Sequence, residues 1–291
     1  MIRDSIKKML PKKTVFEIQQ RKYEHQHQED WKLVSGNDCF KNIHTGKRCF
    51  IIGNGPSVNH VPFAVLSEEY TFTVNQLIRR KDFPELRTNY HMWADERFFD
   101  LQENRPEDME LLSVMRSVNT PGNKPTVFYK TAAKAMIDQF ELEKELKIAY
   151  FMDMCRAYST PELELPFDHV LPRFPTVIHY LILLAVYMGF TEIFLLGCDC
   201  TGIINTVQSR LRSEKELQYG YQISENERKR MQRSNTTFSI QDELRSYADI
   251  FDQYELLKQY CDLRKVSLYN ATKGSLLESV PKVSLEEVLK K

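Results

Sequence analysis

The stretch RCFIIGNGPSVNHVPFAVL, residues 48–66, joins a short apolar run to a turn that is rich in glycine and small polar side chains. The run at 48–52 predicts a β-strand buried on both faces, and the spacing after Gly55 predicts a helix. Glycine allows the backbone to turn sharply where a strand ends, and it allows a ligand to approach the main chain. Pro56 fits the first turn of the helix and Ser57 can cap it. The free N–H groups of that turn therefore predict an anion site, such as a phosphate site.

Short apolar runs alternate with helical patterns along most of the chain. This alternation predicts parallel strands joined by right-handed crossovers, and hence an α/β fold with a doubly wound, mostly parallel, Rossmann-like sheet. The expected strands are 48–52, 71–74, 89–92, 126–129, 193–196 and 267–269. The expected helices include 108–116, 132–142, 175–188, 242–265 and 285–289.

The chain divides into a leader, a main domain and one charged excursion. Residues 1–45 are polar and basic, and the apolar residues near their start fall on one helical face. This basic helical leader is expected to pack on the main domain or on a sister subunit, or else residues 1–15 contact an anionic membrane peripherally. Residues 46–291 are predicted to form a Rossmann-like catalytic domain, and the charged residues at about 201–241 are a predicted lid.

Composition limits the classes of function. The 291 residues include 40 basic and 40 acidic side chains, so no global field indicates a partner nucleic acid. The apolar run 177–190 is short and contains His179, which favours a buried helix over a membrane span. The six cysteines lack the spacing of metal ligands, and they predict buried thiols in a reducing, cytoplasmic setting.

Polar or small residues follow four of the predicted strands. Because open α/β sheets bind ligands beyond the carboxyl ends of their strands, these residues are the candidate site. They are Gly53, Asn54, Gly55 and Ser57 after the first strand, Asn75 and Gln76 after the second, Asp95 after the third, and Cys198 and Asp199 after the strand at 193–196.

The two amides after the second strand suit neutral hydrogen bonds to a base, a ribose or a sugar, although ordinary turn chemistry also places amides there. The first motif lacks the third glycine of the dinucleotide fingerprint. Asp95 fits a general base or, equally, a helix cap.

Five segments carry a resemblance to known proteins. They are FIIGNGPSV, VNQ, MWADERFF, PTVIHYLILLAVYMGFTEIFLLGCDC and YNATKGSLLESVPKVSLEEVL, and together they span about residues 47–289. The pattern resembles the bacterial sialyltransferases that use a CMP-activated nonulosonic acid. It also resembles a broader family that includes motility accessory factors, which modify flagellin, and an archaeal hydroxymethylpterin pyrophosphokinase. The closing segment is more similar to the broader family, and the middle and the charged excursion do not align.

The resemblance to the sialyltransferases implies an inverting, metal-independent glycosyltransferase that needs no cofactor besides its CMP-sugar co-substrate. The donor would carry a sialic-type acid or Kdo, and the acceptor would be a glycan in bacterial surface polysaccharide synthesis. The resemblance also implies contacts of Asn54 and Asn75 with the donor phosphate and sugar, and of the region of Thr176 with cytidine. Tyr219 or Tyr221, from the lid region, would stabilise the departing phosphate. A homo-oligomer is compatible with the family, as is peripheral attachment to the inner membrane.

Two departures from the sialyltransferase pattern leave the catalytic base open. The sequence has Thr-Val-Ile at 176–178 in place of Thr-Ser-Gly, and no histidine follows the excursion. Asp95 is therefore the first choice for the base, whereas His91 and His179 are expected to be structural.

Two other functions remain open from the sequence. One is an ATP-dependent enzyme like hydroxymethylpterin pyrophosphokinase, with Asp95, Glu96 and Asp199 holding Mg²⁺. The other is a nucleotide-binding domain without catalytic activity.

Overall fold

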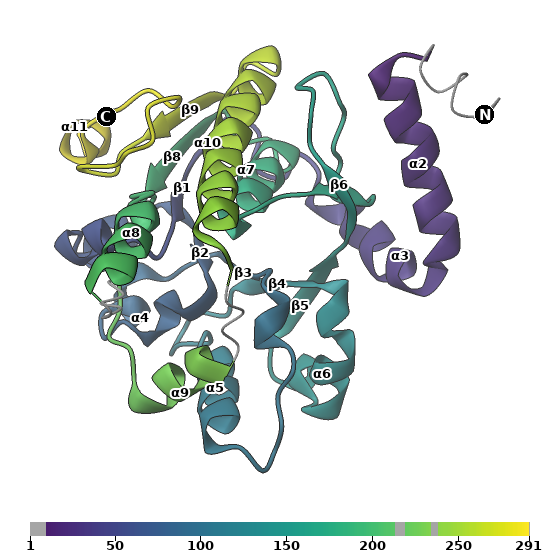
Figure 1. The fold of residues 1–291 in the computed structure, drawn as a ribbon. Helices are drawn as coiled ribbons and strands as arrows, with labels where there is room; N and C mark the ends of the chain where they lie inside the picture. Colours follow the sequence, from purple (N-terminus) through teal and green to yellow (C-terminus); the bar gives the residue numbers. More distant parts are fainter. Residues whose placement is uncertain (1–9, 213–218, 234–237, 291) are drawn as a thin grey trace.

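A computed structural model describes residues 10–212, 219–233 and 238–290, and over these residues the architecture is α/β (Figure 1). Seven parallel strands form the central sheet. In order across the sheet they are β5 (Lys147–Phe151), β4 (Thr126–Lys130), β3 (Tyr90–Trp93), β2 (Tyr70–Val74), β1 (Arg48–Ile52), β8 (Glu192–Leu196) and β9 (Ser267–Asn270). Two further strands, β6 (Asp153–Ala157) and β7 (Leu171–Arg173), pair with each other.

Helices flank the sheet, as the predicted Rossmann-like fold requires (Figure 1). The α-helices are α2 (Lys12–Gln26), α3 (Gln28–Ser35), α4 (Phe83–Leu86), α5 (Pro106–Arg116), α6 (Lys134–Gln139), α7 (Val177–Tyr187), α8 (Gly202–Arg212), α9 (Glu225–Arg233), α10 (Ile240–Leu263) and α11 (Leu285–Leu289). The 3₁₀ helices are η1 (Gly36–Phe40), η2 (Pro56–His60), η3 (Phe63–Leu66), η4 (Asn75–Arg79), η5 (Glu96–Phe98), η6 (Thr131–Ala133) and η7 (Leu142–Lys144).

Six of the central strands match the predicted ones with shifts of one residue at their ends. Strand β5 and the β6–β7 pair were not predicted from the sequence. The sequence predicted one helix over 132–142, which is wrong in extent. The structure has η6 and then the short α6, because Glu141 adopts a left-handed backbone conformation (φ 53°) that a helix cannot continue through.

The order of the strands creates a crevice beside β1. The chain places β2 to β5 successively on one side of β1, and it then returns through α7 to place β8 on the other side. The loops after β1 and β8 therefore leave the carboxyl edge of the sheet in opposite directions. Open α/β sheets bind ligands at such a switch point.

The glycines after β1 are required by the close approach of the loop after β8. A Cβ atom on Gly53 would lie 2.6 Å from the carbonyl oxygen of Gly197, and one on Gly55 would lie 1.9 Å from Oδ2 of Asp199. Gly197 itself has φ 62°, which favours glycine. The close approach of the two strand ends is therefore one reason for these glycines. The approach of a ligand, for which the sequence predicted them, stays a prediction, and both glycines line the cavity described below.

The described part of the leader packs on the main domain. Phe16 is buried in the core, and Gln20 Nε2 donates a hydrogen bond to the carbonyl oxygen of Val170 at 2.9 Å. Asn37 Nδ2 donates to the carbonyl oxygen of Tyr150 at 2.7 Å. These contacts make α2 and the segment after α3 continuous with the α/β core, which is one of the arrangements that the sequence predicted.

Membrane contact through residues 1–15 stays a prediction, since residues 1–9 lie outside the described part of the chain. Among the helices that the structure describes, none combines the length and the apolar character needed to cross a bilayer.

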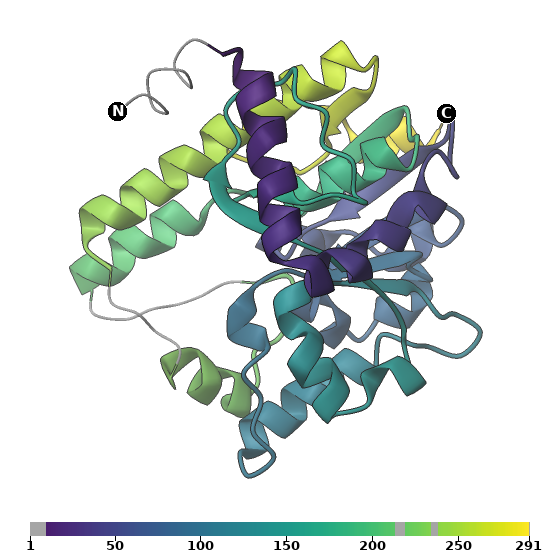
Figure 2. The ribbon, with the colours of Figure 1, turned by 90° about the vertical axis from the view of Figure 1, so that its right-hand side faces the viewer.

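The charged excursion contains more regular structure than the sequence predicted. Its described residues form α8, α9 and the start of α10, with 213–218 and 234–237 outside the description. Helices α8 and α10 lie side by side and extend together away from the sheet (Figure 2). Helix α9 packs on α5, where Arg233 pairs with Glu107 at 2.6 Å and with Asp108 at 2.5 Å.

Candidate functional site

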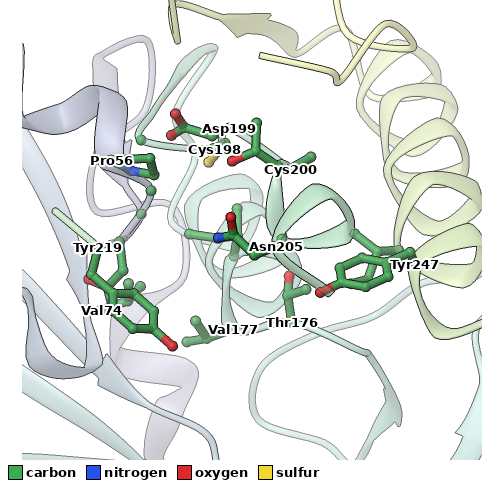
Figure 3. A pocket seen from close by; sticks show the side chains of 18 of the residues that line it. Pro56, Val74, Thr176, Val177, Cys198, Asp199, Cys200, Asn205, Tyr219 and Tyr247 are labelled. Carbon is green, nitrogen blue, oxygen red and sulfur yellow. The ribbon is translucent and has the colours of Figure 1, made fainter. Parts of the chain in front are cut away.

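A cavity of about 370 Å³ lies at the switch point, between the carboxyl ends of β1, β2 and β8 and the helices α7, α8 and α10 (Figure 3). We call it the main cavity. It is large enough for a nucleotide-sized ligand. Of the residues that the sequence predicted, it brings together Gly53, Asn54, Gly55, Asn75, Thr176, Cys198, Asp199 and Tyr219.

Two further cavities adjoin the main cavity and share Asn75 with it. The charged cavity, about 490 Å³, is lined by side chains that include Asp95, Glu96, Lys130, Asp153 and Arg173. The α9 cavity, about 230 Å³, is lined by side chains that include Asn54, Gln76, Asp95, Tyr221 and Glu227. Asn75 therefore stands where the main cavity meets two more polar cavities.

Two side-chain amides with unused oxygens stand at the carboxyl ends of β1 and β2. Asn54 Oδ1 and Asn75 Oδ1 are both inaccessible to solvent, and neither has a hydrogen-bond partner in the structure. Asn75 also has φ 46°, a left-handed conformation that asparagine tolerates better than most residues. A buried amide oxygen without a partner costs free energy, which a ligand that donates a hydrogen bond would recover.

The predicted anion site at the start of η2 is already filled. Asp199 Oδ1 accepts a hydrogen bond from the backbone N–H of Ser57 at 3.0 Å, and Asp199 Oδ2 accepts one from the Ser57 hydroxyl at 2.7 Å. The carboxylate of Asp199 thus takes the place that a phosphate was predicted to occupy. Ser57 serves this internal contact rather than lining the main cavity, so its predicted role in donor binding is not supported by its position.

Helix α7 begins at the boundary between the main and charged cavities. Its N-cap residue, Thr176, lines both cavities, and its side chain does not cap the helix. No acidic side chain occupies the first turn of α7. The N-terminal end of this 11-residue helix therefore presents a partial positive charge close to Asn75.

The two predicted tyrosines lie on a segment that covers the loop after β1. The backbone N–H of Gly220 donates to the carbonyl oxygen of Asn54 at 2.8 Å, which fixes this segment over the strand end. The rings of Tyr219 and Tyr221 stack with their centroids 5.3 Å apart. Tyr219 lines the main cavity, whereas Tyr221 lines only the α9 cavity. Burial raises the pKa of both phenols, so both hydroxyls stay protonated and can donate hydrogen bonds.

Both ends of the Gln76 side-chain amide are hydrogen-bonded to other residues of the protein. Its Oε1 accepts from Arg79 Nε at 2.5 Å, and its Nε2 donates to Glu227 Oε1 at 2.5 Å. Gln76 is only 1% exposed. The sequence predicted a donor-binding residue here, but the structure shows a link between the end of β2 and helix α9.

Asp95 lines the charged and α9 cavities and is paired with Arg97. Arg97 Nε lies 2.9 Å from Asp95 Oδ2, and the backbone N–H of Arg97 donates to Asp95 Oδ1 at 3.0 Å. Burial alone would raise the pKa of the Asp95 carboxyl, but the hydrogen bonds and charge of Arg97 outweigh it and lower the pKa. The alternative of a helix cap is realised, because Asp95 is the N-cap of η5.

Both histidines that were expected to be structural are buried. Burial lowers the pKa of His91 and of His179 to about 3, so both are neutral at physiological pH. His91 Nδ1 lies 2.8 Å from Thr73 Oγ1, inside the sheet. Burial likewise raises the pKa of the Cys200 thiol to about 11 and that of Cys198 further, which leaves both cavity-lining thiols protonated and weakly nucleophilic.

Helices α8 and α10 provide a side of the main cavity that the sequence did not predict. Asn205 projects from α8 into the cavity, opposite Tyr247 of α10 (Figure 3). Phe251 and Tyr254 of α10 line the same cavity. None of the hydrogen bonds found among the described residues involves the Asn205 amide. No local motif marks these residues, because their apolar spacing in the sequence also fits ordinary packing of a helix.

The charged cavity holds a cluster of charged side chains around Lys130 that the sequence did not predict. Lys130 Nζ lies 2.8 Å from Asp153 Oδ1 and 2.5 Å from Glu96 Oε1. The hydroxyl of Tyr180 donates to Asp153 Oδ2. Burial works against the ammonium, but the neighbouring carboxylates outweigh it and raise the pKa of Lys130.

The three carboxylates proposed for a magnesium site do not converge. Asp95 pairs with Arg97 and Glu96 pairs with Lys130, whereas Asp199 lines the main cavity and accepts hydrogen bonds from Ser57. Within residues 10–212, 219–233 and 238–290, no group of three or more histidine, cysteine or carboxylate side chains could hold a metal ion.

Comparisons with models of protein families, with curated proteins and with solved structures found no match to this chain.

Proposed function

We propose that this chain is a glycosyltransferase of the bacterial cytoplasm that transfers a sialic-type acid or Kdo from a CMP-activated donor to a glycan acceptor. The supporting observation is the pair of buried, unpartnered amide oxygens of Asn54 and Asn75 at one edge of the main cavity. The amide N–H groups can donate to phosphate oxygens, and rotation of either amide on ligand binding brings its oxygen to a hydroxyl of the donor sugar. Thr176 and Tyr219 extend the same polar surface.

The main cavity offers each part of the donor a chemically suitable neighbour. The phosphate belongs near Asn54, Asn75 and the start of α7, where N–H donors and the helix dipole stabilise negative charge. Cytidine then extends toward α8 and α10. The sugar points to the charged cavity, from which an acceptor can approach.

The proposed reaction is a displacement at the anomeric carbon of the donor sugar. The bond from that carbon to the phosphate oxygen breaks and CMP leaves with the electron pair, while the acceptor hydroxyl oxygen forms the new bond. The protonated hydroxyl of Tyr219 donates to the departing phosphate, which makes a metal unnecessary. Asp95 receives the acceptor proton. Its lowered pKa suits a late transfer, when bond formation has made the hydroxyl acidic.

The Arg97–Asp95 pair favours one second candidate, a nucleotide-binding domain without catalysis. A carboxylate held by a guanidinium is a weak base, so the chain could bind CMP without transferring a sugar. CMP binding without release of CMP from a CMP-sugar, in the presence of candidate acceptors, would favour this candidate.

Titration calorimetry of the full chain with CMP and with Mg²⁺–ATP tests the proposal. We expect CMP to bind at one site per chain and ATP to bind weakly or not at all. The Asn54→Ala substitution should weaken CMP binding by about tenfold, as expected for losing a hydrogen bond to a charged group. Asn104→Ala changes an exposed asparagine outside the cavities and serves as the control. Tight binding of ATP without any binding of CMP would refute the proposal.

A further inference from the structure

The buried carboxylate of Glu227 on helix α9 is not used by the proposed reaction. Glu227 is 2% exposed, and Gln76, which it contacts, is 1% exposed. Carboxylates are almost never buried this deeply unless they are paired. Its contacts lead to the two strand ends that border the α9 cavity.

The first contact leads to Asn75. Glu227 Oε1 accepts from Gln76 Nε2 at 2.5 Å, and Gln76 is the residue that follows Asn75. The other end of the same amide accepts from Arg79 Nε, so both ends of the Gln76 side chain are fixed. Because the amide cannot turn without losing one of these bonds, the backbone at the start of η4 is fixed as well.

The second contact leads to the end of β3. Glu227 Oε2 lies 3.2 Å from Arg230 Nε, one turn further along α9. Arg230 Nη1 donates to the carbonyl oxygen of Arg97 at 2.8 Å, and its guanidinium lies 4.7 Å from the ring centroid of Phe98. Arg97 in turn holds Asp95. One carboxylate on α9 is thus linked to both strand ends.

The conformation of Asn75 needs such support. A left-handed backbone costs a non-glycine residue about 1–2 kcal/mol and persists only when neighbouring contacts determine it. At Asn75 this conformation accompanies an amide oxygen that is buried without a partner. The turn therefore combines two unfavourable features, and the adjacent residue is the one that α9 secures.

We propose that Glu227 is a positioning residue: through Gln76 it holds the turn at Asn75 in the geometry that directs the Asn75 amide to the main cavity. The docking of α9 and the affinity of the main cavity are then coupled through one buried hydrogen bond. The effect of this hydrogen bond on CMP affinity rests on the proposed function, whereas its effect on the backbone conformation at Asn75 does not.

The contact between an amide and a carboxylate allows a rescue experiment. The Gln76→Glu substitution replaces the donating amide with a second carboxylate. At pH 8, where Arg79 and Arg230 beside the pair favour the ionised form of both carboxylates, no proton is left between them, so the hydrogen bond is lost and the two charges repel each other. In the double variant Gln76→Glu/Glu227→Gln the amide and the carboxylate exchange places, so the hydrogen bond can form again in the reverse direction. Arg79 and Arg230 still find acceptors in the double variant.

Arg233→Gln is the matched control on the same helix. It removes the ion pairs of α9 with Glu107 and Asp108 on α5, which do not involve Gln76. A merely structural loosening of α9 would follow from this change as well. Only the loss of the hydrogen bond between Gln76 and Glu227 should change amide exchange in η4.

Hydrogen exchange of the backbone amides, read separately for η4 and α9, measures the coupling in each variant. We expect Gln76→Glu to speed exchange in η4 at least about tenfold, the double variant to return within about threefold of the original rate, and Arg233→Gln to speed exchange in α9 alone. CMP affinity should fall about tenfold in Gln76→Glu and recover in the double variant. If Gln76→Glu does not fold, recovery of folding and of slow η4 exchange in the double variant supports the proposal.

Two results would overturn the proposal. One is unchanged η4 exchange in a folded Gln76→Glu variant, and the other is a double variant that stays as perturbed as the single one. If no variant, including the original chain, binds CMP, the proposed function fails while the exchange pattern still decides the role of Glu227.

Discussion

Substitution of Asn75 separates its backbone role from its proposed role in binding. Glycine adopts φ 46° without steric cost, so Asn75→Gly should change the free energy of unfolding by less than about 0.5 kcal/mol. The left-handed conformation is sterically unfavourable for alanine, so Asn75→Ala should lower the free energy of unfolding by about 1 kcal/mol. Both variants lack the amide. Both should therefore bind CMP about tenfold more weakly, which corresponds to about 1.4 kcal/mol for a hydrogen bond to a charged group.

Urea denaturation of each variant measures its free energy of unfolding, and titration calorimetry of the same preparation measures its affinity for CMP. The expected pattern is a loss of CMP affinity that is equal in the two variants and a loss of stability that occurs only in the alanine variant. An Asn75→Gly variant that binds CMP as tightly as the original chain would refute the role of the amide. A loss of affinity that follows stability would show that the turn, and not the amide, matters.

Three further predictions address the neighbouring features. Gly55→Ala places a Cβ atom 1.9 Å from a carboxylate oxygen and should cost about 1–3 kcal/mol in urea denaturation, whereas Gly36→Ala meets nothing within 4 Å and should be near neutral. Asn205→Ala should weaken binding of CMP about threefold or more by calorimetry but leave ribose 5-phosphate, which has no base, unaffected; equal losses for both ligands would contradict base recognition. The hydrogen bond and charge of Glu24 outweigh burial and raise the pKa of His169, so this pair stabilises the docked α2 below the ordinary histidine pKa and loses that contribution as the pH rises through the raised one. Proteolysis within α2 should therefore be faster at pH 8 than at pH 6, and His169→Gln should abolish the difference.

The sequence predicted the other strands of the central sheet but not β5, which lies at one edge of it. Strands β1 and β8 each begin with a charged residue and continue with four buried apolar ones, and turn residues follow them directly. Strand β5 begins with an exposed lysine and follows a run of charged residues, so its pattern is close to that of a helix surface. Its pairing with β4 depends on the tertiary fold, which local periodicity does not report.

The sequence predicted the site residues that follow directly after strands. It did not predict those that only the packing of distant helices brings to the cavity. Asn54 and Asn75 follow buried strands, so the strand pattern alone places them at one edge of the sheet. Asn205 lies on α8 within the charged excursion, and nothing near it in the sequence indicates that this helix turns one face to a cavity. Ser57 and Gln76, also predicted as donor-binding residues, are held by other residues of the protein. A polar side chain at a strand end can bind a ligand or another residue, and only the fold shows Asp199 and Glu227 opposite them.

The proposed binding mode can be seen in a crystal structure of the full chain with CMP. We expect the phosphate to lie within hydrogen-bonding distance of the Asn54 and Asn75 side chains, with the cytosine between α8 and α10. A phosphate seated against η2 in place of Asp199, or a CMP molecule bound outside the main cavity, would contradict it.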